Sequence, residues 1–146
     1  MILLSMLQIQ AEGPVLRITL NRPEVRNAFN DELINRLTAA FSNLPQGTRA
    51  VVLKGEGAAF CAGGDIRGMQ ERLKAAPGEV AINGWRRQQR NHHFVETLHS
   101  LPKPTIAAVN GAAAGLIAAS VLPKHTPWMP TFGRPLVRTL NACVSA

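Results

Sequence analysis

The stretch Gly55–Gly68 (GEGAAFCAGGDIRG) constrains the fold of this chain more than any other part of it. It follows an apolar run, Ala50–Leu53, that is typical of a buried strand, and it leads into a helical pattern that begins at Asp65. The small residues in between let the backbone approach a ligand closely and expose its N–H groups. The pair Gly63 and Gly64 at the helix start therefore predicts outward-pointing donors for an anion, with Asp65 placed to cap the helix.

Two common phosphate-binding motifs do not fit this stretch, and a glycine-rich turn that merely joins strand to helix remains an alternative. The dinucleotide-binding fingerprint fails because Phe60 stands where a third glycine is required after Gly55 and Gly57. The P-loop fails because no Gly-Lys-Ser/Thr follows. Basic residues nearby could meet phosphates, although each alone is more often a surface charge; they are Arg22, Arg26, Lys54 and Arg67.

The rest of the chain reads as an alternation of strands and helices. Apolar and polar residues alternate along Leu7–Gln10 and Val15–Leu20, which predicts a hairpin. An amphipathic helix is expected from a cap at Asn30 or Asp31 to Leu44. Further helices are expected at residues 65–73 and 82–100, with a break at residues 75–78 between them, and further strands at residues 50–53 and 105–109. This order is typical of an α/β fold with parallel strands.

A second small-residue turn follows the strand at residues 105–109. It begins with Asn110 and Gly111, and the segment Ala112–Ala119 is expected to start a helix. When two strands of one parallel sheet end in such turns, their exposed N–H groups can point at a common crevice. Two donors that converge on one oxygen are what a carbonyl needs as it becomes an enolate. A small-residue helix that only packs on the sheet is the alternative.

Composition narrows the choice of partners. The 146 residues predict one compact domain, and the net charge of +7 suits an anionic partner or reflects solubility alone. Nucleic acid is not expected, because the basic residues after Glu96 are scattered and the chain has no Tyr. No metal site is expected, because Cys61 and Cys143 are far apart and the adjacent His92 and His93 point to different helix faces. The absence of a leader or membrane-spanning stretch predicts a cytoplasmic protein with no membrane partner.

Three motifs follow one another along the chain: Leu20–Glu24 followed by Arg26–Ala28, then Ala59–Ile66 (AFCAGGDI), then Lys103–Gly111 (KPTIAAVNG). In this order and at these spacings they resemble the enoyl-CoA hydratase/isomerase (crotonase) family. The resemblance covers residues 7–115. It implies an α/β, crotonase-like spiral of ββα units, acyl-CoA thioester substrates and a homo-trimer or hexamer. Coenzyme A would be part of the substrate, and no separate cofactor is expected.

The resemblance also implies roles for individual residues. The backbone N–H of Gly64 would be one oxyanion donor, and Leu116, after the second turn, would supply the other. The acyl-CoA would be bound by residues of the first and second motifs and by the end of the third, namely Val25, Arg26, Ala28, Ala62, Gly63, Gly64, Asp65, Ile66 and Gly111. The implied chemistry is stabilisation of a thioester enolate, as in a hydratase or isomerase. The motif around Cys61 also resembles the hydroxyacyl-CoA hydrolases of the family.

The sequence departs from the family pattern from Leu116 onward. Leu116 and Ile117 are bulky where the family prefers small residues, and Ala119 stands where hydratases carry an acid/base glutamate. No acidic residue follows Glu96, and prolines recur beyond Leu122 without a helical or strand period. We therefore expect an incomplete crotonase-like core at residues 1–116 and an unplaced C-terminal tail at residues 117–146, as a truncated or frame-altered chain would have. Two functions remain open: an acyl-CoA hydratase/isomerase-type enzyme, or a non-catalytic CoA-binding or assembly module that includes the case of an inactive fragment.

Overall fold

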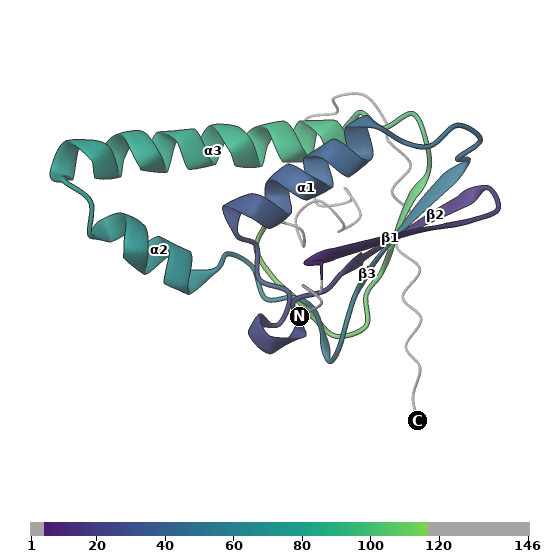
Figure 1. Ribbon diagram of the computed structural model, residues 1–146, viewed down its shortest axis with the longest axis horizontal. Helices are drawn as coiled ribbons and strands as arrows, with labels where there is room; N and C mark the ends of the chain where they lie inside the picture. Colours follow the sequence, from purple (N-terminus) through teal and green to yellow (C-terminus); the bar gives the residue numbers. More distant parts are fainter. Residues whose placement is uncertain (1–4, 117–146) are drawn as a thin grey trace, which may run out of the picture.

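The computed structural model describes residues 5–116, and a four-stranded sheet organises them (Figure 1). Its strands lie in the order β1 (Leu7–Glu12), β2 (Val15–Leu20), β3 (Ala50–Gly55) and β5 (Thr105–Ala108). β1 and β2 form the expected antiparallel hairpin, whereas β2, β3 and β5 run parallel to one another. Parallel neighbours need crossover connections, and helices make up most of each one. The expected α/β class is confirmed.

Two helices cover the sheet and close the core. α1 (Asp31–Ser42) starts at the expected cap, because Asn30 Oδ1 accepts a hydrogen bond from Leu33 N–H at 2.8 Å. α1 and the long α3 (Pro77–His99) lie side by side (Figure 1). Phe94 of α3 joins them, with ring centroids 5.8 Å from Phe29 and 6.1 Å from Phe41. The most deeply buried apolar side chains come from β2, β3, α1, α3 and the segment Ala59–Cys61: Leu16, Ile18, Leu20, Leu33, Leu37, Val51, Leu53, Phe60, Cys61 and Phe94.

A second, two-stranded sheet was not expected from the sequence. β4 (Ala59–Cys61) and β6 (Ala112–Ala113) pair in parallel, so the stretch Gly55–Gly68 is interrupted by a short buried strand. The segment Ala112–Ala119 does not start as a helix, because its first residues belong to β6; the helical state begins at Leu116. Strands of three and two residues are too short to show an alternating pattern, which is why both were missed.

A short 3-10 helix, Pro23–Val25, follows the hairpin and precedes α1. The region between β4 and β5 differs in part from expectation, although α2 (Ile66–Leu73) begins as predicted after Asp65. The expected break at residues 75–78 is shorter, because Pro77 opens α3 well before Ile82. Proline is well suited to the first helical position, where its missing N–H would have no intrahelical partner. No side chain of α2 is buried, so its apolar face does not join the core of the described residues.

Apart from the short 3-10 helix, the elements follow one another as β1-β2-α1, β3-β4-α2-α3 and β5-β6, which is the expected succession of ββα units with one additional helix in the second. None of the helices within residues 5–116 combines the length and the apolar character needed to cross a bilayer. The tail predicted at residues 117–146 lies outside the described residues, together with Ile117, Ala119 and Cys143.

Candidate functional site

A short parallel bridge holds the Gly63 turn against the segment that precedes α1. The N–H of Phe29 donates to the Gly63 carbonyl at 2.7 Å, and the N–H of Asp65 donates to the Phe29 carbonyl at 2.8 Å. Gly64 lies opposite Phe29, so its own N–H and C=O are directed away from that segment. Gly63 has φ +93°, which glycine adopts without strain. The Gly64 N–H consequently donates no hydrogen bond to any residue within 5–116.

A buried asparagine ties the turn after β2 to the same loop. Asn27 is completely buried, and its Nδ2 donates to the carbonyl oxygens of Glu56 and Ala59, both at 2.8 Å. Its Oδ1 accepts from the backbone N–H of Arg22 at 2.8 Å. Asn27 and the preceding Arg26 both lie in the left-handed region, with φ 56° and 52°. Asparagine tolerates this conformation better than most residues, so one side chain fixes both the turn and its distance from β4.

A nearly buried ion pair joins the same turn to the start of α2. Arg22 Nη2 lies 2.9 Å from Asp65 Oδ2, and each side chain is only 12% exposed. Arg22 also donates to the Ala28 carbonyl at 2.6 Å, while Asp65 caps α2 by accepting from Arg67 N–H at 3.1 Å. Burial disfavours the ionised form of Asp65, but the Arg22 guanidinium and the helix N–H groups outweigh it and lower the pKa of Asp65. Arg22 is therefore neither a surface charge nor available for a phosphate.

The second small-residue turn meets the first at the end of β6. The N–H of Ala114 donates to the Cys61 carbonyl at 2.9 Å. Gly115 has φ +69°, and a Cβ added to it would stand 3.1 Å from Gly63 Cα and 3.9 Å from Gly64 N. Any side chain at Gly115 would thus be in tight contact with the Gly63 backbone and would be strained by the positive φ. The prediction that the two turns converge is thus fulfilled in the geometry, although through a strand and not through a helix start.

The beginning of the same turn is fastened to the loop before β4. A Cβ added to Gly111 would collide with the Ala58 carbonyl oxygen, so Gly111 is in backbone contact with the chain and not with open space. Next to it, Asn110 Nδ2 donates to the Gly57 carbonyl at 2.7 Å. The Asn110 and Gly111 pair therefore sets the position of β6 relative to β4.

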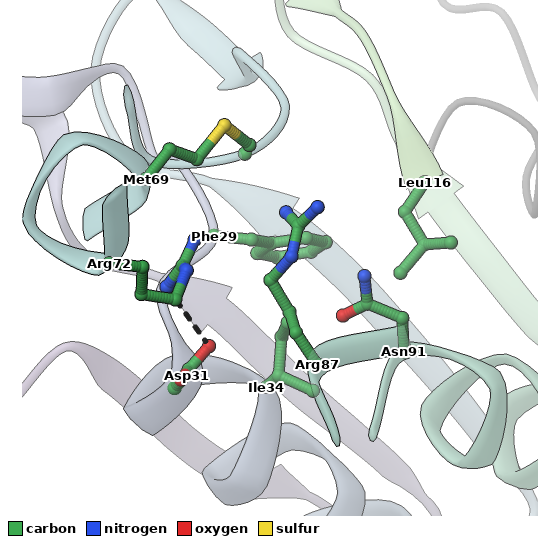
Figure 2. A pocket seen from close by; sticks show the side chains of 9 residues that line it. Phe29, Asp31, Ile34, Met69, Arg72, Arg87, Asn91 and Leu116 are labelled. Atoms are coloured by element: carbon green, nitrogen blue, oxygen red, sulfur yellow. Dashed lines mark ion pairs between the residues drawn. The ribbon is translucent and has the colours of Figure 1, made fainter. Parts of the chain in front are cut away.

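A cavity of about 250 Å³ lies where these turns face the helices (Figure 2). Gly64 and Leu116, the residues predicted to supply the two donors, both line it. Leu116 is half-buried and packs against the main core. The remaining lining side chains come from α1, α2, α3 and the residues just before α1: Phe29, Asp31, Ile34, Met69, Arg72, Arg87 and Asn91.

One carboxylate faces this cavity among the residues that line it, and it is already engaged. Asp31 Oδ1 lies 3.8 Å from Arg72 Nη1, the pair drawn with a dashed line in Figure 2. The other oxygen, Asp31 Oδ2, lies 2.6 Å from Arg90 Nη1. Both oxygens thus have a cationic neighbour, and no unpaired acid is available there to move a proton.

The other residues predicted to bind acyl-CoA surround the turns outside this cavity. The N–H of Ala62 donates to the Arg26 carbonyl at 2.9 Å, which joins the first motif to the second. Ala28 is buried, whereas the side chains of Arg26 and Ile66 are exposed. The remaining members range from buried Gly63 through half-buried Val25 and Asp65 to exposed Ala62 and Gly111. Their predicted role in binding the substrate stays a prediction.

The contacts of three residues that organise the site were not predicted from the sequence: the ion pair of Arg22, the hydrogen bonds of Asn27, and the bond from Asn110, which was named only as the start of the second turn. Each acts over a distance in the chain: Arg22 pairs with Asp65, and Asn27 reaches Glu56. No local period signals such contacts. The one available signal was that Asn27 and Asn110 both lie inside the motifs that carry the family resemblance.

The described residues hold no group of three or more His, Cys, Asp or Glu side chains that could bind a metal ion. Cys61 is a free, buried thiol at the end of β4. Burial raises its pKa, and a contact with the Gly63 backbone offsets this only partly. A thiol in this environment is unreactive, so Cys61 fills the core beneath the turn and does not act as a nucleophile.

Comparison with known proteins shows to which family this chain belongs. The family model described as enoyl-CoA hydratase/isomerase matches residues 10–117, most of the chain. The chain belongs to the enoyl-CoA hydratase/isomerase family. It is 41% identical over 99 residues to a Rhodobacter capsulatus protein named "Probable enoyl-CoA hydratase", covering 67% of this chain and 35% of that one. It is 37% identical over 113 residues to the 1,2-epoxyphenylacetyl-CoA isomerase of Escherichia coli, covering 76% and 42%.

A solved enoyl-CoA hydratase structure from Shewanella pealeana shares the fold of this enoyl-CoA hydratase/isomerase family member. It superposes with a TM-score of 0.72 at 25% identity and covers 82% of this chain and 44% of that one. The crotonase-like fold expected from the three motifs is thereby confirmed for the matched part. The chain spans less than half the length of these relatives.

Proposed function

We propose that this chain binds an acyl-CoA thioester and stabilises the enolate form of its carbonyl, as in hydratases and isomerases of its family. The oxygen that becomes negative would accept hydrogen bonds from the backbone N–H groups of Gly64 and Leu116. Coenzyme A is part of this substrate, and no separate cofactor is needed. Membership of the family and the names of its relatives, an enoyl-CoA hydratase and an acyl-CoA isomerase, support the substrate class.

A single observation carries the proposal: the N–H of Gly64 is left unused by the bridge to Phe29, at a residue that lines the same cavity as Leu116. Gly64 is exposed at the edge of this cavity, so its N–H is accessible to a ligand that can accept a hydrogen bond. In a preorganised site such a donor favours the transition state because nothing has to reorient when charge develops. The ion pair and the Asn27 network supply that rigidity by holding the turn from both sides.

Binding without turnover is the second candidate, and one observation favours it. Asp31, the acid among the described cavity residues, is held by two arginines, and the sequence contains no acidic residue after Glu96. A hydratase or isomerase needs a group that moves a proton within hydrogen-bond reach of the substrate. Without one, the chain would hold acyl-CoA or assemble with other copies, as a trimer or hexamer, without catalysing a reaction.

The test replaces Gly64 in the full chain and measures the binding of acetoacetyl-CoA. This thioester enolises readily, and oxyanion donors increase the ultraviolet absorbance of its bound enolate. Gly64→Pro removes the N–H, and we expect the enolate signal to fall about 100-fold or more, the usual effect of losing one such donor. Gly64→Ala is the matched control, because it retains the N–H and its added Cβ meets only the flexible end of Met69. Free coenzyme A should bind all three proteins equally.

Turnover of crotonyl-CoA separates the two candidates. Enolate formation together with turnover supports the enzyme, and enolate formation alone supports the binding module. If Gly64→Pro and the unaltered chain give the same enolate signal while both remain folded by circular dichroism, Gly64 is not a donor and the proposal fails.

A further inference from the structure

Arg87 is the one charged side chain of the described cavity lining that has no opposite charge beside it. Arg72 is paired with Asp31, and Arg90 holds the other oxygen of the same carboxylate. Arg87 also lines the cavity but forms no ion pair and no hydrogen bond with any residue in the described part of the chain. Figure 2 shows its side chain extending from α3 into the space between Met69 and Leu116.

The arrangement leaves a net positive charge inside the cavity. Arg87 is half-buried, so its guanidinium has lost part of its hydration, and a bound anion would offset that cost. One helical turn further on, Asn91 faces the same space (Figure 2), and its Oδ1 is buried without a partner within residues 5–116. A rotation of that amide would present N–H donors instead of the oxygen. Arg87 and Asn91 therefore form a polar pair, at positions i and i+4 of α3, whose hydrogen-bonding groups are not used by other residues within 5–116.

We propose that Arg87 binds a carboxylate carried by the acyl group, so that the preferred substrate is the CoA thioester of a dicarboxylic acid. Arginine suits this task because its planar guanidinium donates two parallel hydrogen bonds to a carboxylate. Asn91 would contribute a further hydrogen bond to the same group. The inference rests on the proposed function, because it takes the thioester carbonyl to lie at Gly64 and Leu116.

The position of Arg87 favours a carboxylate on the acyl group over a phosphate of coenzyme A. Arg87 shares one cavity of about 250 Å³ with Gly64 and Leu116. In coenzyme A the phosphates are separated from the thioester by the whole pantetheine arm, whereas the far end of a short acyl group is only a few bonds away. A cation in the same small cavity as the carbonyl donors is therefore within reach of the acyl group.

The experiment compares matched thioesters that differ only in charge. A series from malonyl-CoA to adipyl-CoA is titrated into the full chain, each beside its uncharged ω-amide. We expect at least one acid to bind about tenfold to a hundredfold more tightly than its amide, as charge-assisted hydrogen bonds usually provide. Arg87→Met should abolish this preference and leave the affinity for the amides and for free coenzyme A unchanged. Arg86→Met is the control, because Arg86 is exposed and does not line the cavity.

Three results would overturn the inference, and they can be told apart. If acid and amide bind equally to the unaltered chain, the charge of Arg87 does not select the acyl group, while the proposed function stands. If Arg87→Met weakens acids, amides and free coenzyme A alike, Arg87 contacts a phosphate. If no thioester binds to a chain that is folded by circular dichroism, the proposed function itself fails and the inference fails with it.

Discussion

Asn27 shows how one side chain can determine the geometry of a loop that it does not belong to. It donates to two carbonyls of the Glu56–Ala59 segment and accepts from Arg22 N–H, while its own backbone is left-handed. Asn27→Ala would leave three backbone groups without this partner, one of them buried and two partly buried, and would strain φ. We expect the free energy of unfolding to fall by about 3 kcal/mol or more, measured by urea denaturation.

The control for Asn27 is another asparagine whose side chain also donates to a carbonyl. Asn43 Nδ2 lies 2.9 Å from the Ala39 carbonyl, but Asn43 is exposed and has a negative φ. Because water replaces its hydrogen bond, Asn43→Ala should change the stability by less than about 1 kcal/mol. Equal effects of the two substitutions would contradict the role assigned to Asn27.

Cys61 gives a second prediction at the scale of one residue. Its thiol is buried and its pKa is raised, first by burial, so little thiolate forms and reagents cannot reach it. In a Cys143→Ser background, we expect Cys61 to react with a thiol reagent at least about 100-fold more slowly than in denatured chain, because reaction requires opening of the structure. Rapid labelling of the native protein would show that β4 is not closed over the thiol.

At the scale of elements, the Arg22–Asp65 ion pair connects the turn after β2 with the start of α2. The pKa of Asp65 is lowered in the folded state, because Arg22 and the helix N–H groups outweigh the effect of burial. The stability that this provides is fully present above the pKa of an unfolded aspartate, about 3.9, and is lost as the pH falls through the lower native pKa. Asp65→Asn should therefore be less stable than the unaltered chain near neutral pH, and the difference should shrink below about pH 3.9.

The measurement is urea unfolding of both proteins across this pH range. Glu12→Gln serves as the control, because the Arg17–Glu12 pair has a similar distance of 2.9 Å but is nearly half exposed. Such surface pairs contribute little, so this variant should track the unaltered chain at every pH. A difference for Asp65→Asn that stays constant down to the lowest pH would show that the carboxylate charge is not what stabilises the turn.

The helices and strands that could be predicted are those whose sequence pattern is contained in the element itself. α1 was predicted because Asn30 caps it and Leu33, Leu37 and Phe41 recur at helical spacing, and all three are buried. β4 could not be predicted, because its three residues show no periodic pattern and its partner strand β6 lies far away in the chain. The start of α3 was placed too late because Pro77 was interpreted as a break and not as the first residue of a helix.

In the candidate site, too, the features with a local signal could be predicted from the sequence, and the contacts between distant residues could not. The Gly63 and Gly64 turn and the convergence of two strand ends follow from small residues after apolar runs, which are visible in the sequence. The contacts that make the turn rigid are not visible, because Arg22 pairs with Asp65 across 43 positions and Asn27 reaches Ala59 across 32. The charge of the cavity likewise depends on which arginines Asp31 neutralises, and only the packing of α1 against α2 and α3 determines that.

At the scale of the whole described chain, the site exists because the two sheets bring two distant turns into backbone contact. β3 and β5 are neighbours in the large sheet, and β4 and β6, which follow them, are neighbours in the small one. Gly115 completes this arrangement, because its Cα region lies against Gly63 and its φ is +69°. A substitution there acts on both turns at once.

We therefore expect Gly115→Ala to separate the two turns. The added Cβ would stand 3.1 Å from Gly63 Cα, so the Gly63 backbone would have to move by a few tenths of an ångström. Gly13→Ala is the matched control, because Gly13 also has a positive φ of 56° but no atom within 4 Å of the added Cβ. Both variants should lose about 1 kcal/mol through the strained φ. Gly115→Ala alone should also weaken the acetoacetyl-CoA enolate signal about tenfold to a hundredfold, since small displacements of positioned donors have effects of this size. An equal enolate signal in the two variants would mean that the Gly115 turn does not help to form the site.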